Sequence, residues 1–268
     1  MKRSIQDIPI ALVGAGNLAT NLGKALYHNG FRIVQVYSRT EEAAAMLASA
    51  VEAEYTADPA AVTHEASLYI VALKDSTLAE VLPRLVKGRE DALWVHTAGS
   101  ISIDIWQLTT ATRAGVFYPM QTFSKQREVD FREIPLFVEA TDEEDAGLLT
   151  RLANTLSQKV YRASSEQRKS LHLAAVFTCN FTNHMYALAA DLLRKYNLPF
   201  DVMLPLIDET ARKVHEIAPA EAQTGPAARG DENVMAMHRT MLDDEPQLQK
   251  VYRLLSESVE NYKLKSKS

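Results

Sequence analysis

Short apolar runs alternate with mixed segments along the first part of the chain. Leu68–Leu73 is a continuous apolar run, as expected for a strand that is buried on both faces of a sheet. Leu18–His28 predicts a helix, because the Asn29 and Gly30 that follow it form a helix-end signal. Strands are predicted at Ile8–Val13, Phe31–Tyr37, Ala53–Thr56, Leu68–Leu73, Ala92–His96, Gly115–Tyr118, Leu136–Glu139 and Lys159–Tyr161, and further helices at Glu41–Ser49, Leu78–Val86 and about Glu143–Leu156. Strands that alternate with helices predict the α/β class, with a doubly wound, mostly parallel Rossmann sheet.

The pattern changes after Ser164 and Ser165, where the rest of the chain predicts helices alone. One long helix is expected from Ser165, its candidate N-cap, to Tyr196. Further helices are expected at Phe200–Ile217, Asn233–Leu242 and Pro246–Tyr262. We therefore predict two domains, a dinucleotide-binding domain over residues 1–163 and an all-helical domain over residues 164–268.

The turn between the first strand and the first helix follows the G-x-G-x-x-A pattern of dinucleotide-binding folds. In that pattern Gly14 permits the tight turn, Gly16 lets the backbone approach a pyrophosphate, and Ala19 lets the helix pack on the strand. The phosphates then meet free N–H groups at the start of the helix. A structural turn and a site for another nucleotide are the alternatives. The residues expected at the phosphates are Gly14, Ala15, Gly16, Asn17 and Leu18.

The second strand ends in Ser38, Arg39 and Thr40. Sites that prefer NAD usually place an acidic residue here, which accepts hydrogen bonds from the ribose hydroxyls. Two hydroxyls and a guanidinium suit the 2′-phosphate of NADP instead, although a solvated arginine at a helix start is the alternative. The same three residues argue against S-adenosylmethionine, whose ribose is also commonly held by an acid at this place.

Ligands of open α/β sheets cross the carboxyl ends of the strands, so the residues that end the next strands are site candidates. Asp75 equally suits a helix N-cap. His96 is either an acid–base group or a hydrogen-bonded structural residue. Tyr118 and the following Gln121 and Thr122 either face the cleft or form an ordinary packed loop. The cofactor contacts expected at these strand ends are Ala72, Leu73, Asp75, Thr97, Ala98 and Gly99.

Polar side chains interrupt the apolar surface of the predicted long helix. His172, Cys179 and Asn183 fall on nearly one stripe of an α-helix, with Asn180 beside it. Such groups either satisfy one another or face a cleft. His172 and His184 lie about 18 Å apart at the α-helical rise, so they cannot share one ion, and no metal site is predicted.

The segment Thr224–Asp231 contains two glycines, a proline, an arginine and an aspartate. Outside any helix, this composition predicts a shaped loop that faces a ligand. Arg229 is the candidate for binding a carboxylate or phosphate. The alternative is an ion pair between Arg229 and Asp231, with Asp231 capping the next helix.

The overall composition is that of an ordinary globular protein, with 47% hydrophobic residues, 24% charged residues and a net charge of −5. Nothing in this balance indicates a nucleic-acid surface. The chain has one cysteine, Cys179, so it cannot form an internal disulfide. With no evident signal peptide and no apolar run of membrane-spanning length, we expect a cytoplasmic protein without a membrane partner.

A Rossmann half followed by an all-helical half resembles the group of pyrroline-5-carboxylate reductase, ketopantoate reductase and 6-phosphogluconate dehydrogenase. The segments His96–Ser100, Tyr118–Phe123 and Thr224–Asp231 more closely resemble a bacterial family that pairs a Rossmann-like domain with a helical domain of unknown function. Members of that family are assigned as NADP oxidoreductases. The resemblance implies a nicotinamide site and a homodimer built through the helical domain.

One position departs from the related dehydrogenases. Hydroxyacid dehydrogenases and ketopantoate reductase carry a catalytic lysine on the long helix, four residues before an asparagine. Asn180 is present in this chain, but Val176 occupies the lysine position. An imine reductase needs less help from such a lysine.

We therefore expect an NADP-dependent oxidoreductase that transfers hydride between NADP(H) and a small imine or keto or hydroxy acid in a cleft between the two halves. His96 is the candidate proton donor, and His172, Asn180 and Arg229 are candidate substrate-side groups. The alternative is a protein that binds or senses NADP without turning it over. Methyl transfer is disfavoured by Ser38 and Arg39.

Overall fold

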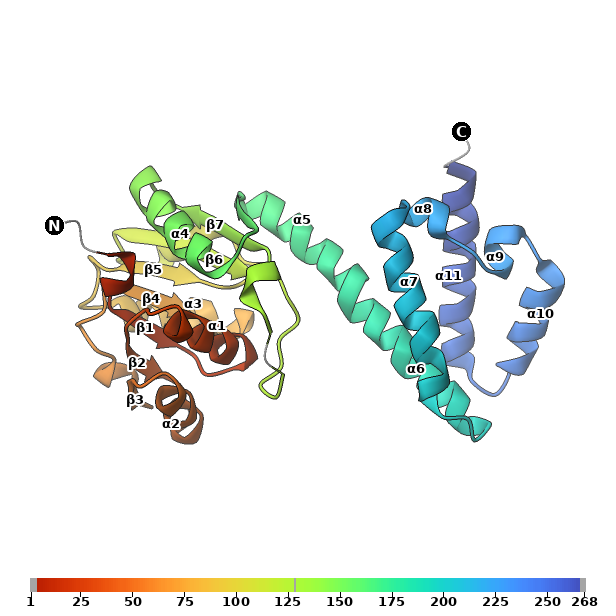
Figure 1. Ribbon diagram of the computed structural model, residues 1–268, viewed down its shortest axis with the longest axis horizontal. Coiled ribbons are helices and arrows are strands. Elements are labelled where there is room, and N and C mark those ends of the chain that lie inside the picture. Colours follow the sequence, from red (N-terminus) through yellow and green to blue (C-terminus); the bar gives the residue numbers. More distant parts are fainter. Residues whose placement is uncertain (1–3, 128, 266–268) are drawn as a thin grey trace. The chain divides into compact units, whose positions relative to one another are not determined.

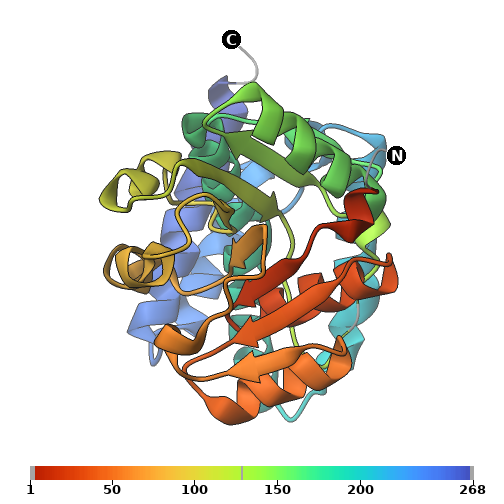
Figure 2. The same cartoon turned by 90° about the vertical axis from the view of Figure 1, so that its left-hand side faces the viewer.

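A single eight-stranded sheet organises the N-terminal part of the chain. The computed structural model describes residues 4–127 and 129–265. Its strands are β1 (Ile10–Val13), β2 (Ile33–Tyr37), β3 (Glu54–Thr56), β4 (Leu68–Val71), β5 (Leu93–His96), β6 (Arg113–Pro119), β7 (Leu136–Ala140) and β8 (Val160–Arg162). Their order in the sheet is β3-β2-β1-β4-β5-β6-β7-β8, and Figure 2 views the sheet with β1, β2 and β3 pointing the same way. Among these strands all neighbours pair in parallel except β6 and β7, which confirms the mostly parallel Rossmann sheet.

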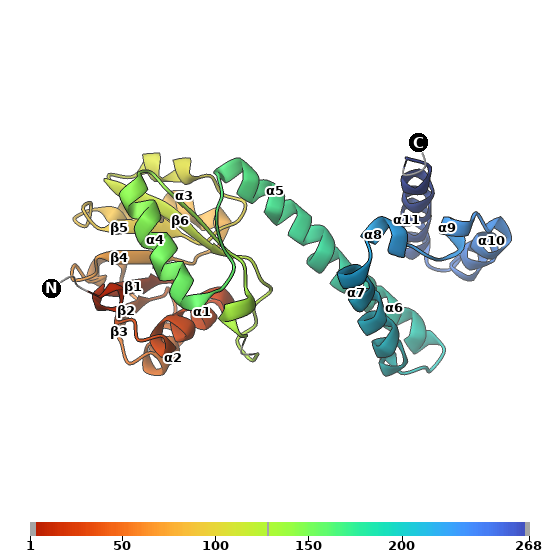
Figure 3. The same cartoon turned by 45° about the horizontal axis from the view of Figure 1, so that its top comes forward.

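Helices cover both faces of this sheet. They are α1 (Asn17–His28), α2 (Glu41–Ala50), α3 (Asp75–Val86) and α4 (Glu143–Leu156), with the short helices η1 (Ile5–Asp7), η2 (Pro59–Ala61), η3 (Ile103–Leu108) and η4 (Phe131–Glu133). Side chains of α1, α2 and α4 share one core with Ile10 and Leu12 of β1, whereas α3 and η3 share another with Ala11 and Val13. Successive side chains of a strand point to opposite faces, so a strand covered on both faces is apolar at nearly every position. Figure 3 shows α4 lying across the sheet.

The remainder of the chain is helical. Its elements are α5 (Ser165–Ala175), the π-helical segment η5 (Val176–Phe181), α6 (Thr182–Lys195), η6 (Phe200–Met203), α7 (Leu204–Glu216), α8 (Pro219–Ala222), α9 (Pro226–Arg229), α10 (Glu232–Met241) and α11 (Pro246–Lys265). The long helix expected from Ser165 is present and runs to Lys195 (Figure 1), but its middle is π-helical. A π-helical turn holds more residues than an α-helical turn, so the single stripe expected for His172, Cys179 and Asn183 on a regular α-helix is not maintained.

Two local expectations in this region are corrected. The N-cap of α5 is Ser164 and not Ser165, because the Ser164 hydroxyl accepts from the Gln167 N–H while the Gln167 side chain accepts from the Ser164 N–H. The predicted loop at Thr224–Asp231 contains the one-turn helix α9, bounded by Gly225 and Gly230 at positive φ. A proline at the first helical position and a left-handed glycine after the last one explain this turn.

The chain divides into two compact units, residues 1–180 and 181–268. The predicted boundary after residue 163 falls where the strands end, since β8 ends at Arg162. The first turns of α5 nevertheless belong with the sheet, because Arg168 is buried there, at 1% exposure.

The second unit buries few apolar side chains of its own. Within its described residues the buried hydrophobic side chains are Ala228, Met235 and Leu242. Helix α9 contacts both α10 and α11, but α6 and α7 contain no buried residue. The large apolar side chains of α6 are therefore only half-buried in a single chain, and Leu204, Leu206 and Val214 of α7 are exposed.

Candidate functional site

Four parallel strands end together at one edge of the sheet. Val13 of β1 is in register with Tyr37 of β2 and with Val71 of β4, and Val71 is in register with His96 of β5. The residues that follow these strand ends are therefore neighbours along the carboxyl edge. The predicted cofactor residues gathered here are Gly14, Ala15, Gly16, Asn17, Leu18, Ser38, Arg39, Thr40, Ala72, Leu73, Asp75, Thr97, Ala98 and Gly99.

The turn between β1 and α1 leaves a cradle that suits a phosphate. Gly14 has a φ of +122°, and a Cβ there would lie 2.3 Å from the Ala72 carbonyl oxygen, so only glycine fits. A Cβ on Gly16 would meet nothing within 4 Å, which leaves open space beside the backbone. Within the described residues no side chain caps the first N–H groups of α1. These amides fit the phosphates of a dinucleotide.

Asn17 has a structural partner in addition to its place in this turn. Its side-chain amide donates to the carbonyl oxygen of Phe123 at 3.0 Å, and Asn21 on the next turn donates to the Ser124 carbonyl at 3.0 Å. The loop after β6 is thereby fixed against the start of α1.

At the end of β2 the exposed residue Arg39 stands between Ser38 and Thr40 in the sequence. Ser38 is buried, and its Oγ lies 3.5 Å from Oγ1 of Thr40. Arg39 and Thr40 are both exposed. A cation and two hydroxyl groups on consecutive residues are suited to a phosphate ester.

The ends of β4 and β5 are linked by side chains. Lys74, and not Asp75, takes the N-cap position of α3. The Asp75 carboxylate instead accepts a hydrogen bond from the Ser100 hydroxyl in the loop after β5. The Thr97 hydroxyl donates to the Val71 carbonyl oxygen at 3.3 Å.

Tyr118 and His172 form a polar pair beside Gly99. The Tyr118 hydroxyl lies 3.4 Å from Nδ1 of His172, within hydrogen-bonding distance. A Cβ on Gly99 would lie 2.7 Å from the Tyr118 ring and 2.9 Å from His172 Nδ1, so the pair directly overlies this glycine. Burial raises the pKa of Tyr118 above its ordinary value, although the positive charge of Arg168 opposes the shift. The phenol therefore stays protonated at neutral pH and can act as a donor.

His96 is enclosed by the fold at the end of β5. It is fully buried, its ring is stacked with Trp106 at 6.0 Å between centroids, and its Nδ1 accepts from the Ala98 N–H at 3.2 Å. Among the described residues its Nε2 has no hydrogen-bond partner. Burial, and then the nearby charge of Arg168, lower the pKa of His96 to about 3. At neutral pH the imidazole is therefore uncharged and enclosed, and this geometry gives no support to its predicted role as a proton donor.

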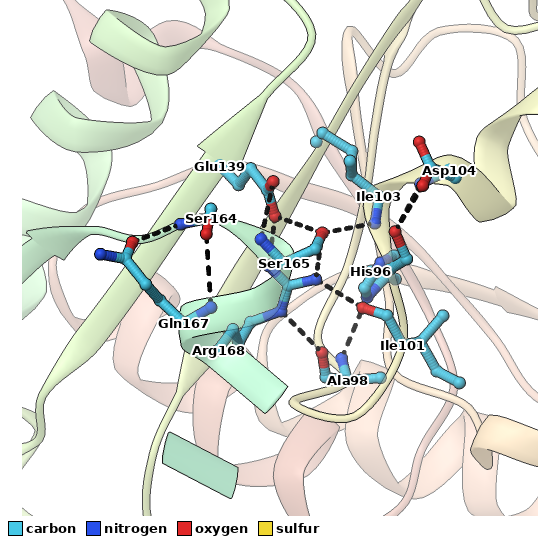
Figure 4. Close-up of polar contacts among 12 residues, drawn as sticks. His96, Ala98, Ile101, Ile103, Asp104, Glu139, Ser164, Ser165, Gln167 and Arg168 are labelled. Atoms are coloured by element: carbon cyan, nitrogen blue, oxygen red, sulfur yellow. Dashed lines mark hydrogen bonds and ion pairs between the residues drawn. The ribbon is translucent and has the colours of Figure 1, made fainter. Parts of the chain in front are cut away.

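Arg168 is a buried cation that the sequence did not single out (Figure 4). Its guanidinium pairs with the Glu139 carboxylate of β7 and donates to the carbonyl oxygens of Ala98 and Ile101 in the loop after β5. Ser165, one turn earlier on α5, also bonds to Glu139. The only available signal was an arginine four residues before His172 on a helix predicted to border the site.

The other predicted substrate-side groups lie in different units. Asn180 is exposed in η5, at the end of the first unit, and Arg229 is exposed at the end of α9 in the second. Asp231 caps α10 by accepting from the Val234 N–H at 3.4 Å, and no ion pair joins it to Arg229 in the part of the chain that the structure describes. Across the described residues, no cluster of three or more His, Cys, Asp or Glu could hold a metal ion, and no helix is long and apolar enough to cross a membrane.

Comparison with known proteins identifies both halves of the chain. Residues 9–99 match the family described as NADP oxidoreductase, coenzyme F420-dependent, and residues 134–259 match the domain of unknown function DUF2520. No curated protein matches the chain. A Bacteroides fragilis protein of known crystal structure, provisionally described as an NADP oxidoreductase, is 68% identical, with a TM-score of 0.92 over 96% of this chain and 100% of that one.

More distant structures share the fold. An imine reductase from Myxococcus stipitatus in complex with NADP+ is 15% identical, with a TM-score of 0.64 over 94% of this chain and 92% of its own. A 1-pyrroline-5-carboxylate reductase from Streptococcus pyogenes is 11% identical, with the same TM-score of 0.64 over 96% of this chain and 99% of that one. These findings confirm the resemblance indicated by the sequence motifs.

Proposed function

Because the chain belongs to the family of NADP oxidoreductases that joins this Rossmann domain to a DUF2520 helical domain, we propose that it reduces a small imine or 2-keto acid. NADP is its cofactor, and NADPH supplies the hydride when bound. The observation that carries the proposal is the Tyr118–His172 pair over Gly99, which places a protonated phenol at the carboxyl edge of the sheet.

The cofactor is held across the ends of β1, β2, β4 and β5. The open space at Gly16 and the uncapped start of α1 are the reasons for placing the pyrophosphate at the end of β1. Arg39, with Ser38 and Thr40, binds the 2′-phosphate. The switch point of the sheet lies between the neighbouring strands β1 and β4, where the chain returns from β3, so the nicotinamide half lies toward the loops after β4 and β5.

Tyr118 donates the proton that accompanies reduction. When the carbon of the substrate's C=N or C=O bond gains hydride, the nitrogen or oxygen of that bond takes up one proton. This proton comes from the Tyr118 hydroxyl. His172 then returns a proton from solvent to Tyr118. Val176 at the place of the lysine found in related dehydrogenases favours an imine, which needs less polarisation than a carbonyl. Asn180 and Arg229 remain the proposed substrate-side groups.

The active molecule is a homodimer formed through the helical part of the chain, and it works in the cytoplasm. The large exposed apolar side chains of α7 and α11 support the dimer, because they are not buried within one chain. A single cysteine supports a reducing compartment.

Cofactor choice is tested by calorimetric titration of wild type, Arg39→Ala and Arg32→Ala with NADPH and NADH. Arg32 is the matched control, because it is exposed and lies just before the first residue of β2, at the end of the strand opposite to Arg39. Wild type should prefer NADPH, and Arg39→Ala should lose about ten- to hundredfold of NADPH affinity, the range for a charge-assisted hydrogen bond. NADH affinity should stay the same in all three proteins. Equal loss in both arginine variants would contradict the assignment to Arg39.

The reductase activity is tested by following NADPH consumption with a panel of cyclic imines and 2-keto acids. Tyr118→Phe keeps the ring and removes the hydroxyl, so it should lower the turnover number by roughly 10²–10⁴-fold. Tyr161→Phe is the control, because Tyr161 is half exposed on β8. NADPH binding without consumption on any member of the panel would contradict the proposed substrate class, and full activity of Tyr118→Phe would contradict the proton donor.

A further inference from the structure

The loop after β5 is held at both ends by one buried side chain. Arg168 donates from Nε to the Ala98 carbonyl oxygen at 3.3 Å and from Nη2 to that of Ile101. Gly99 and Ser100 lie between these two acceptors. The guanidinium therefore bridges the base of a short turn, as Figure 4 shows.

Residues of β7 and of the start of α5 hold the same guanidinium. Nη1 pairs with Glu139, and Nη2 lies 3.2 Å from the Ser165 hydroxyl oxygen. The Ser165 oxygen also accepts from the Ile103 N–H at 2.9 Å, and its hydroxyl donates to Glu139 at 2.8 Å. The loop from Ala98 to Ile103 is thus attached to α5 by three hydrogen bonds.

An ion pair alone does not explain this arrangement. Arg113 also pairs with a carboxylate, through two N–H groups to the buried Asp145, at the opposite, amino end of β6. The hydrogen bonds of Arg113 go to the Asp145 carboxylate, whereas those of Arg168 go also to two backbone carbonyls of a loop at the carboxyl edge. Lysine could keep the charge of Arg168, but its single ammonium lacks the planar set of donors that reaches all of these acceptors.

Further contacts hold the turn from the outside. The Ser100 hydroxyl donates to Asp75 at the start of α3, and Gly99 lies against Tyr118 and His172. With both flanks fixed, a displacement of the turn would break the bonds of Arg168 and leave a buried cation without its acceptors.

We propose that Arg168 is a positioning residue that holds the Ala98–Ile101 turn in the conformation that receives the nicotinamide half of NADP. The inference rests on the proposed placement of the cofactor across the strand ends. Arg168 acts through the backbone of this turn and does not itself contact the cofactor. Its loss should weaken binding of the nicotinamide half and spare the adenosine half.

The test compares two ligands in wild type, Arg168→Lys and the matched control Arg113→Lys. NADPH reports on both halves of the site, and adenosine 2′,5′-bisphosphate reports on the adenosine half alone. We expect Arg168→Lys to lower NADPH affinity at least tenfold and to change affinity for the bisphosphate less than twofold. Arg113→Lys should change neither affinity, even where it lowers the melting temperature as much. Either unchanged NADPH affinity in Arg168→Lys or an equal loss for both ligands would overturn the inference.

Hydrogen exchange of the wild-type protein tests the same loop without requiring that any variant folds. The Ala98 and Ile103 N–H groups bond to His96 and Ser165, so their hydrogen exchange in the ligand-free protein should be slow. Unprotected exchange at these two amides would overturn the inference that this loop is held in place. Wild type that binds the bisphosphate and NADPH equally would overturn the placement of the nicotinamide, whereas wild type that binds neither ligand would overturn the proposed cofactor site itself.

Discussion

His96 shows how one buried side chain links the fold to pH. The folded protein holds its imidazole neutral, with a pKa of about 3, because burial and the nearby charge of Arg168 disfavour a second proton. In the unfolded chain a histidine takes up that proton near pH 6.5. Between these two values the unfolded state binds more protons, so stability is complete above about pH 6.5 and falls as the pH is lowered toward 3.

We expect His96→Asn to flatten this dependence, because its side-chain oxygen can still accept from the Ala98 N–H but cannot titrate. Urea unfolding from pH 7 to pH 4 should show a difference in slope between the two proteins of up to about 1.4 kcal/mol per pH unit, the value for one proton. Carboxylates contribute equally to both curves and cancel in the difference. Parallel curves for wild type and variant would show that His96 does not titrate between the folded and unfolded states.

Residue chemistry also limits how much of the site the sequence could indicate. The glycine motif predicted Gly14 and Gly16 because their roles are local, and the structure adds the acceptor that excludes a side chain at Gly14, the Ala72 carbonyl. From the sequence Tyr118 has two interpretations, and Arg168 belongs to no motif. Both matter through partners that are distant along the chain, such as Arg168 with Ala98, and no spacing rule predicts a contact between segments 70 residues apart.

At the scale of elements, periodicity and helix-end signals predicted most of the secondary structure. The buried parallel strands gave the clearest signal, because a strand covered on both faces is apolar at nearly every position. Helix α4 has the predicted bounds, Glu143–Leu156. These signals depend on residues close together in the sequence and on whether an element is buried, and the local choice of apolar and polar residues reflects both.

The elements that were missed depend on finer geometry. A π-helical turn differs from an α-helical one by a shift in hydrogen-bond partner and has no composition of its own, so η5 could not be anticipated. Helix α9 is one turn long and was predicted as loop, since its glycine and proline signals mark either structure. At the N-terminus of α5, Ser164 and Ser165 are equivalent by type, and only the position of Gln167 three residues later favours Ser164.

At the scale of the whole molecule, the two units differ in how they bury apolar side chains. The first unit has cores on both faces of its sheet, whereas α6 and α7 of the second bury none of their residues within one chain. Leu206 of α7 and Leu254 of α11 are 63% and 67% exposed. Amphipathic helices gain most of their stability from packing an apolar face, so these faces need a partner surface.

A second copy of the chain is the partner that we expect, and analytical ultracentrifugation tests it. Wild type should sediment as a dimer at micromolar concentration. Leu206→Glu should raise the dissociation constant at least tenfold, because a carboxylate would lose its hydration in an apolar interface. Leu108→Glu is the matched control, since Leu108 is 57% exposed but lies in the sheet unit, and it should remain dimeric. A wild-type protein that sediments as a single chain would contradict the dimer, and equal dissociation of both variants would place the interface elsewhere than on α7.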